Sequence, residues 1–290
     1  MSETEAARVG DRHDCPKHGG GPIVTGSTNV FVNSTPFAHV ADRASCGGPS
    51  DYLVTGAAKV TVNGKKASRV TSHCMHGGKV AAGSPNVLVG GPEAGGTLGN
   101  PDAAKRACKD LSQGRVKQPG QNPDQQDFSN CGIESSRLLM HQATGSNVGE
   151  IPLLDQAIAL GDASVHKENG ITTSMGGSTL NGQRDLLSKN GVATQSVAAT
   201  QDNISQAVAD GQGVISHHDV GPLWQTTQKG GHAINATGLN YDDNGNLKSV
   251  TTVDSGVGSC ARDVPAGDYF QSMDVGGFKN AIVTSTPIWK

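Results

Sequence analysis

The first ninety residues repeat one pattern three times, and this repeat restricts the fold more than any other feature of the sequence. The period is about thirty residues, and equivalent segments begin near residues 7, 38 and 68. Each is followed by alternating apolar stretches separated by Asn or Gly, which is typical of β-hairpins. Because such short hairpins cannot each bury a face alone, we expect the three copies to pack around a common axis as an all-β prism with pseudo-threefold symmetry.

The repeat also places Cys or His, residue types that bind metals, at the same position in each of its three copies. The fourth position after each repeated segment holds Cys15, Cys46 or His76, and a Cys-x-x-His run adds His18. Two thiolates and two imidazoles suit a closed, tetrahedral, structural Zn²⁺ site. The sequence therefore predicts a structural zinc ion held by these four side chains. Three other residues are near enough in sequence to take the fourth position: His13, His73 and Cys74.

Residues 5–91 resemble the PAAR family, the cone-shaped tip proteins of the bacterial type VI secretion spike. The resemblance rests on Ala-Ala-Arg-Val-Gly-Asp at 6–11, Cys-Pro at 15–16 with Gly-Pro-Ile at 21–23, Cys-Gly-Gly-Pro-Ser-Asp at 46–51 and His-Gly-Gly at 76–78. It implies a zinc-stabilised, cone-shaped tip that sits by its blunt face on a trimeric VgrG spike. PAAR proteins often carry an effector at the C-terminal end.

The composition changes after residue 91. The Gly-rich and Pro-rich ends of the segment 92–119 are typical of connecting loops. Between them, the pattern of residues 103–111 predicts one short helix with Asp102 as its N-cap. We assign no role to Cys108. The predicted organisation is a tip domain over 1–91, a linker over 92–119 and a second domain over 120–290. Helical patterns at 151–160, 181–190 and 201–210 and strand patterns at 192–197 and 213–216 indicate that the second domain is α+β.

A cysteine stands at the start of an apolar helical pattern in the second domain. Cys131 is followed by Gly132 and then by Ile133, Leu138, Leu139 and Met140. The first-turn N–H groups and the helix dipole favour the thiolate, which is the nucleophilic form. Gln125, just upstream, could donate its side-chain amide to an oxyanion beside the backbone N–H of Cys131. The alternative is a small buried Cys without a chemical role.

A downstream hairpin supplies the residue types that would complete a nucleophilic site. Residues 231–239 predict a strand, 242–245 a tight turn and 247–253 the returning strand, which places His232 and Asp254 side by side. A carboxylate beside an imidazole fixes its tautomer and stabilises the imidazolium. Taken alone, each residue could have a purely structural role: His232 as a hydrogen-bonded residue at a strand end, and Asp254 as the cap of a turn.

Two alternatives remain open from the residues themselves. His217 and His218 end another strand and compete with His232 as the base, with Asp219 adjacent. A zinc site built from Cys131, His232 and Cys260 is the second, although these residues have no recognisable ligand spacing.

Residues 120–290 resemble papain-like cysteine peptidases of the bacteriocin-processing, double-glycine-leader type and their bacterial toxin relatives. Beyond the Cys131 and His232 segments, the resemblance runs through 186–192, 210–215, 223–224 and 264–270. It implies Cys131 as nucleophile, His232 as general base and acid, Asp254 as the residue that orients the imidazole and Gln125 as oxyanion donor, with no cofactor in the catalysis. Gln126 is the alternative donor.

Net charge, the N-terminal segment and the number of cysteines restrict the classes of binding partner and the cellular location that we expect. The 290 residues carry a net charge of −3 at pH 7 and show no basic stripe, so we expect neither nucleic-acid binding nor stable membrane insertion. The acidic N-terminus lacks the apolar core of a signal peptide. We therefore expect synthesis in the cytoplasm and export by type VI secretion into a target cell. Six cysteines in this setting favour metal binding or catalysis over a disulfide framework.

These features predict an effector: a spike tip carrying an antibacterial cysteine peptidase that cleaves a target-cell protein through an acyl-enzyme on Cys131. The family also implies a cognate immunity protein that blocks the cleft. One alternative is a peptidoglycan amidase in the target periplasm, and another is a non-catalytic extension of the tip. A transferase or deamidase with the same acyl chemistry is a further option.

Overall fold

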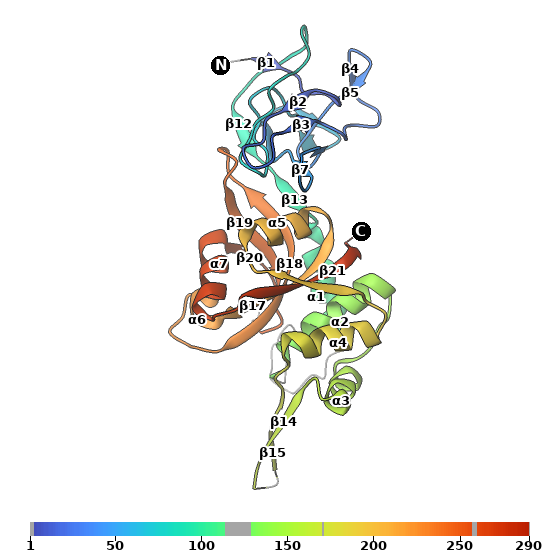
Figure 1. Ribbon diagram of the computed structural model, residues 1–290, viewed down its shortest axis with the longest axis vertical. Helices are drawn as coiled ribbons and strands as arrows, with labels where there is room; N and C mark the ends of the chain where they lie inside the picture. Colours follow the sequence, from blue (N-terminus) through green and yellow to red (C-terminus); the bar gives the residue numbers. More distant parts are fainter. Residues whose placement is uncertain (1–2, 114–128, 170, 257–259, 290) are drawn as a thin grey trace. The chain divides into compact units, whose positions relative to one another are not determined.

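The computed structural model describes residues 3–113, 129–169, 171–256 and 260–289 (Figure 1). The chain divides into two compact units. The first comprises Met1–Leu98 and Leu239–Lys248, and the second comprises Gly99–Gly238 and Ser249–Lys290. Within the described residues, no helix combines the length and the hydrophobicity needed to cross a bilayer.

The first unit is built from very short antiparallel strand pairs, as the repeat predicts. Most of its strands are two residues long, because a turn follows each pair of extended residues. The pairs are β2 (Arg12–His13) with β3 (Gly21–Pro22), β4 (Phe31–Val32) with β5 (Thr35–Pro36), β6 (Arg43–Ala44) with β7 (Asp51–Tyr52), β9 (Thr61–Val62) with β10 (Lys65–Lys66), β1 (Thr4–Glu5) with β11 (Leu88–Val89), and β8 (Thr55–Ala57) with β12 (Glu93–Gly95).

Single β-bridges connect the three copies in a closed ring. The first copy meets the second, the second meets the third, and the third returns to the first. The bridged pairs are Arg8 with Phe37, Ile23 with Ala44, His39 with Ala67, Leu53 with Cys74, Ala6 with Arg69, and His13 with Val80. Equivalent apolar residues of each copy fill two small cores, one of which contains Val32, Val62 and Val89 and the other Ile23, Leu53 and Val80. The all-β character predicted for this region is thus confirmed.

The second unit is α+β, as predicted. Its central sheet has the strand order β16-β21-β17-β18-β19-β20, and β13 pairs with β18 beside this path. The strands are β13 (Thr97–Gly99), β16 (Thr194–Ala198), β17 (Gln212–Asp219), β18 (Gly231–Tyr241), β19 (Leu247–Val253), β20 (Ala261–Pro265) and β21 (Asn280–Pro287). The hairpin predicted over 231–253 is present as β18 and β19, and the turn between them closes with a bond from Gly245 N to the Asp242 carbonyl of 3.0 Å.

Seven helices surround this sheet within the described residues, and a separate hairpin of β14 (Ser164–Glu168) and β15 (Ile171–Gly176) projects away from it (Figure 1). The helices are α1 (Pro101–Gln113), α2 (Cys131–Thr144), α3 (Glu150–Leu160), α4 (Leu180–Lys189), α5 (Gln201–Ala209), α6 (Val220–Trp224) and α7 (Ala266–Val275). Thr179 and Thr200 cap α4 and α5 through their hydroxyl groups. Such caps satisfy first-turn N–H groups that lack a partner in the helix.

The sheet separates two environments by the alternation of its side chains. Ile215, Ala233 and Val253 belong to the main apolar core, together with buried residues of α1, α2, α3 and α4. Ser216 and His218 of β17 instead bind residues of α7 on the opposite face. Helix α2 therefore approaches the sheet from the core side, which brings its first residue to the edge where β18 begins.

The segment predicted as a linker contains more regular structure than the sequence indicated. Residues 93–99 form β12 and β13, and the predicted helix over 103–111 is present as the longer α1. Asn100 caps this helix in place of Asp102: its side-chain oxygen accepts a hydrogen bond of 3.0 Å from Ala103 N, and Asp102 lies in the first turn.

Candidate active site and candidate metal centre

Cys131 is the first residue of α2, at the end of the helix where the dipole is positive. Its sulfur accepts a hydrogen bond of 3.3 Å from the backbone N–H of Ala233 on β18. A β-carbon at the next residue, Gly132, would overlap the side chains of Gln183 and Ser178, so both would have to move to accept one. The nucleophile predicted from the sequence thus lies at a helix start, packed against the strand that carries His232.

His232 and Asp254 come together as the hairpin predicts. His232 is the second residue of β18, Asp254 directly follows β19, and His232 Nε2 lies 2.6 Å from Asp254 Oδ1. Both side chains are buried, with exposed fractions of 5% and 1%. Since Nε2 is bound to the carboxylate, Nδ1 is the ring nitrogen left to interact with the thiol of Cys131, whose pKa His232 lowers against the effect of burial. Cys131, His232 and Asp254 are therefore connected in series.

Cys131, His232 and Asp254 shift one another's pKa values toward their charged forms. Burial alone would raise the pKa of Cys131, but the hydrogen bond and the charge of His232 outweigh it and bring the thiol pKa below its ordinary value. Burial would lower the pKa of His232, but Asp254 and Cys131 raise it to about 10. The Asp254 pKa is lowered, because His232 and other donors overcome the effect of its burial. This arrangement favours a thiolate beside an imidazolium, as nucleophilic cysteines require.

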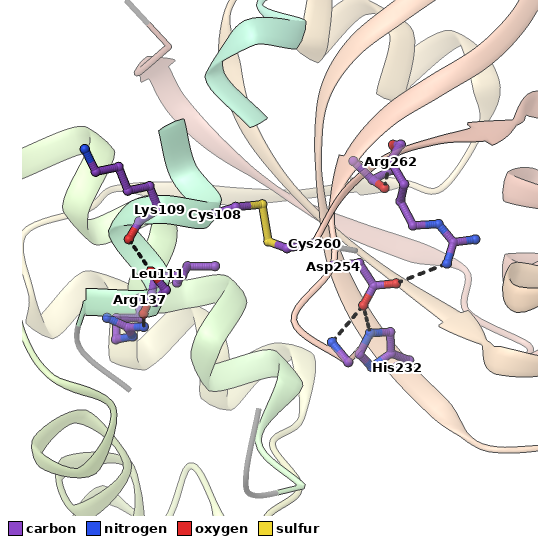
Figure 2. The surroundings of a disulfide bond; sticks show 11 residues. Cys108, Lys109, Leu111, Arg137, His232, Asp254, Cys260 and Arg262 are labelled. Atoms are coloured by element: carbon purple, nitrogen blue, oxygen red, sulfur yellow. Dashed lines mark hydrogen bonds and ion pairs between the residues drawn. A yellow bond between two sulfur atoms is a disulfide. The ribbon is translucent and has the colours of Figure 1, made fainter. Parts of the chain in front are cut away.

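Two hydrogen-bond donors and one cation beside Asp254 were not predicted from the sequence as functional groups. Trp224 Nε1 donates to Asp254 Oδ2 at 2.9 Å, and its ring centroid is 5.0 Å from that of His232. Gly256 N donates to Asp254 Oδ1 at 2.9 Å, and Arg262 Nη1 is 4.0 Å from Oδ2 (Figure 2). The available signals were that Trp224 is one of only two tryptophans in the chain and that segment 223–224 is part of the resemblance to cysteine peptidases.

Buried polar groups also support the start of α2. Asn130, directly before the nucleophile, donates from Nδ2 to Glu150 Oε1 at 2.9 Å, and both residues are almost fully buried. Gln183 of α4 donates from Nε2 to Ser178 Oγ at 3.0 Å and to His217 Nε2 at 2.9 Å. No pattern in the sequence connects these residues with Cys131, because they lie on separate elements that meet only in the folded unit.

The alternatives for the base and for a second metal site are disfavoured. His218 is fully buried between Ser272 Oγ at 2.7 Å and Ser216 Oγ at 2.8 Å, and burial, reinforced by the charge of His232, lowers its pKa to about 3. Burial and the charge of His232 also lower the pKa of His217 to about 4. Cys260 forms a disulfide with Cys108 and is therefore unavailable as a zinc ligand beside Cys131.

For Cys108 and Cys260, the disulfide corrects the expectation that the cysteines serve metal binding or catalysis, and it gives a partner to Cys108, to which the sequence assigned no role. The other four cysteines are free thiols. Gln125 and its alternative Gln126, predicted as oxyanion donors, lie outside the described residues. The backbone N–H of Cys131, at the first position of α2, lacks a partner within the helix in principle, as all first-turn N–H groups do.

In the first unit, the four predicted zinc ligands gather in one cluster. The ligand atoms of Cys15, His18, Cys46 and His76 all lie within 4.8 Å of one another. Cys15 Sγ is 3.7 Å from His76 Nδ1 and 3.9 Å from His18 Nδ1, and Cys46 Sγ is 3.9 Å from His76 Nδ1. Two sulfur and two nitrogen donors at this spacing fit a tetrahedral Zn²⁺ ion, which would draw the four atoms closer together.

A second arrangement shares both cysteines. His13, Cys15, Cys46 and Asp51 also form a group with ligand atoms within 4.8 Å. Asp51 Oδ2 is buried and has no hydrogen-bond partner among the described residues, although His13 Nε2 lies 3.3 Å from it. Among the three residues weighed for the fourth position, His13 is therefore adjacent to the cluster, whereas Cys74 belongs to an apolar core. His73 packs against Gly245 of the β18–β19 turn.

Comparison with known sequences identifies the N-terminal region. Residues 2–50 and 17–82 match the PAAR motif family. Two curated relatives from Pseudomonas aeruginosa are each 34% identical over 90 residues: the NAD(P)(+) glycohydrolase toxin Tse6 of strain PAO1 and the (p)ppApp synthetase toxin Tas1 of strain UCBPP-PA14. The matched region is 27% of this chain and spans only 21% and 20% of those two proteins. Residues 2–82 thus carry a PAAR motif.

The solved structures that are similar to part of this chain include a candidate C39-like peptidase from Bacillus anthracis, with a TM-score of 0.40 and 17% sequence identity. The similar region covers 61% of this chain and 96% of that protein.

Proposed function

We propose that this chain is a type VI secretion effector whose PAAR-like tip carries a cysteine hydrolase, with Cys131, His232 and Asp254 as catalytic residues. The observation that carries the proposal is that His232 Nε2 lies 2.6 Å from Asp254 Oδ1, while the next residue on the strand, Ala233, donates its backbone N–H to Cys131 Sγ at 3.3 Å. A thiol at a helix start, a base and an orienting acid are the parts that acyl transfer requires. The papain-like fold and the assignment as a peptidase belong to the same proposal.

The chemistry follows from the positions of these atoms. Cys131 Sγ attacks the carbonyl carbon of an amide, a C–S bond forms, and the charge moves to the carbonyl oxygen. His232 then gives its proton to the leaving nitrogen, the C–N bond breaks and an amine departs. Water next attacks the thioester as His232 accepts its proton, and the C–S bond breaks to release a carboxylic acid. Asp254 holds the imidazole in one tautomer throughout, and we assign the oxyanion to the N–H of Cys131 with Gln125.

In the tip, we propose that Cys15, His18, Cys46 and His76 hold a structural Zn²⁺ ion. When bound, the metal would connect three repeat copies that otherwise share only small apolar cores. The partners in this proposal are a VgrG spike trimer, a cognate immunity protein and a target-cell protein as substrate. The PAAR motif supports the spike partner, and the other two rest on the resemblance to toxins.

The test is growth of bacteria that express the full chain in the cytoplasm or behind a periplasmic signal peptide, each beside Cys131→Ala. We expect killing that depends on Cys131 and is relieved by Cys131→Ala at equal protein levels. Ser205→Ala, a small change on α5, is the matched control and should kill like the native chain. Killing by Cys131→Ala equal to that by the native chain would refute the catalytic proposal and favour a non-catalytic extension of the tip.

The compartment in which killing occurs separates the two hydrolase alternatives. Killing from the cytoplasm supports a peptidase that acts on an intracellular protein. Killing confined to the periplasm supports the second candidate function, an amidase of peptidoglycan. The Cys108–Cys260 disulfide favours this second candidate, because disulfides persist in oxidising compartments such as the periplasm and are rare in the cytosol.

A further inference from the structure

The disulfide joins two segments that flank the candidate active site. Cys108 lies on α1, and Cys260 is buried directly before β20 (Figure 2). The backbone carbonyl of Cys260 accepts a hydrogen bond of 2.8 Å from the backbone N–H of Asp254. Cys260, one half of the disulfide, is therefore hydrogen-bonded through its backbone to Asp254, the proposed catalytic acid.

Helix α1 is in turn fixed to α2, the helix that begins with Cys131. Arg137 of α2 donates from Nη2 to the carbonyl of Leu111 on α1 at 2.5 Å (Figure 2). The same guanidinium is held by Glu134, with Nε 2.8 Å from Oε1, and both side chains are buried. Because α1 contacts α2 through Arg137 and the Asp254 segment through the disulfide, it connects the parts of the unit that carry the nucleophile and the acid.

The position of Asp254 is demanding, because its carboxylate is 1% exposed and must keep its oxygens on His232, Trp224 and Gly256 together. A buried carboxylate is tolerated only while its donors remain in place. If the Cys108–Cys260 bond is broken, the Cys260 backbone loses its covalent connection to α1. The Cys260 carbonyl, which accepts the hydrogen bond from Asp254 N, is then less firmly positioned.

We propose that the Cys108–Cys260 disulfide is a redox-controlled positioning element for Asp254, so that the hydrolase site is fully assembled only when this bond has formed. The inference rests on the proposed function. Formation breaks two S–H bonds and makes one S–S bond. The two electrons and two protons pass to a disulfide oxidant, which becomes two thiols. In a reducing cytoplasm the site would stay incompletely assembled, and in a compartment that forms disulfides it would become competent.

The test measures the alkylation rate of Cys131 by iodoacetamide against pH in the full chain, with each cysteine peptide resolved by mass spectrometry. Three samples are compared: the native chain oxidised with glutathione disulfide, the native chain reduced by a phosphine that is then removed under argon, and the double variant Cys108→Ser with Cys260→Ser. Ile204→Ala is the control for lost stability, because Ile204 is fully buried on α5 and lies outside the apolar core that contains Cys260.

We expect the oxidised chain to alkylate rapidly at pH 6, as a thiolate paired with an imidazolium does. In the reduced chain and in the double variant the rate at pH 6 should fall about tenfold or more, which corresponds to about one unit in the thiol pKa. At pH 9.5 all rates should agree within about twofold, since an ordinary thiol is then ionised. Reoxidation should restore the rate at pH 6, and Ile204→Ala should keep the native profile.

The other outcomes are distinguishable. If the reduced chain and the double variant keep the native pH profile and only unfold more easily, the disulfide is a structural crosslink and the inference is overturned while the proposed function stands. If the oxidised native chain already titrates as an ordinary thiol, and His232→Ala does not change its profile, the proposed function fails and the inference fails with it.

Discussion

The two units assemble their chemical groups in different ways. In the first unit, Cys15, Cys46 and His76 occupy one phase of a repeated hairpin, and ring closure by β-bridges brings equivalent positions together. In the second unit, Cys131 and His232 stand at the starts of a helix and a strand, and Asp254 follows the end of another strand. Symmetry gathers the first cluster, whereas packing of unlike elements gathers the second.

This difference predicts how each site responds to damage. The side chains of the candidate metal cluster belong to different copies, so if they hold a metal ion, loss of one of them should weaken the unit as a whole. The proposed hydrolase site is held by a buried network around the Asp254 carboxylate, so a change there should alter reactivity more than stability.

The largest effect should come from removal of the metal from the first unit. Cys46→Ser, or a strong chelator at pH 7, should lower the thermal unfolding midpoint of this unit by the equivalent of several kcal/mol, because metal binding is coupled to folding in small domains. The second unit should unfold as before. Calorimetry together with metal analysis measures both. Cys74→Ala is the control, since Cys74 lies in an apolar core, and it should keep the zinc. Full zinc content in Cys46→Ser would contradict the proposed ligand set.

The next effect concerns reactivity. Asp254→Asn should reduce killing and the alkylation rate of Cys131 at pH 6 by about 10²- to 10⁴-fold, because an amide does not stabilise the imidazolium. The sign follows from the lowered pKa of Cys131 and the raised pKa of His232. Loss of the carboxylate lowers the His232 pKa, and the thiolate then forms only near an ordinary thiol pKa of about 8.5. Asp263→Asn, on the exposed part of β20, is the matched control. A native profile in Asp254→Asn would rule out its orienting role.

A smaller effect should follow from the contact between Trp224 and Asp254. Trp224→Phe keeps a ring beside His232 but removes the Nε1–H donor, which is 2.9 Å from Asp254 Oδ2. A hydrogen bond to a charged group contributes about 1.5–3 kcal/mol, so the pH 6 alkylation rate of Cys131 should fall by roughly ten- to a hundredfold. The rate at pH 9.5 and the unfolding midpoint separate this effect from misfolding. An equal loss at both pH values would indicate a packing role for Trp224 in place of a positioning role.

The smallest effect lies in the junctions of the repeat. Gly10, Ala41 and Thr71 occupy equivalent positions with φ of 89°, 71° and 81°, a conformation that only glycine adopts without strain. Thr71→Gly should therefore stabilise the first unit by about 1 kcal/mol, and Gly10→Ala should destabilise it by a similar amount. A β-carbon at Gly10 meets nothing within 4 Å, so this change tests the backbone alone. Urea unfolding with intact metal measures both shifts, and a Thr71→Gly variant less stable than the native chain would contradict the strain argument.

The sequence alone determined the features that depend on periodicity and local chemistry. Alternating residues with Asn and Gly turns indicated the strand pairs of the first unit, and repeat phase selected Cys15, Cys46 and His76 as neighbours. The hairpin over 231–253 was readable because both strands and their turn are adjacent in the chain, and this placed His232 beside Asp254. In each case the interacting residues are local in sequence or related by a repeat.

Only the tertiary structure decided the features that join distant, unrelated segments. Cys108 and Cys260 are separated by 152 residues, and no spacing rule pairs them. Trp224 reaches Asp254 from a short helix that carries no signature of that contact. Gln183 fills the space beside Gly132 because α4 packs against α2. Such contacts depend on how whole elements pack and bury polar groups, and that information is spread over the entire chain and absent from any local pattern of residues.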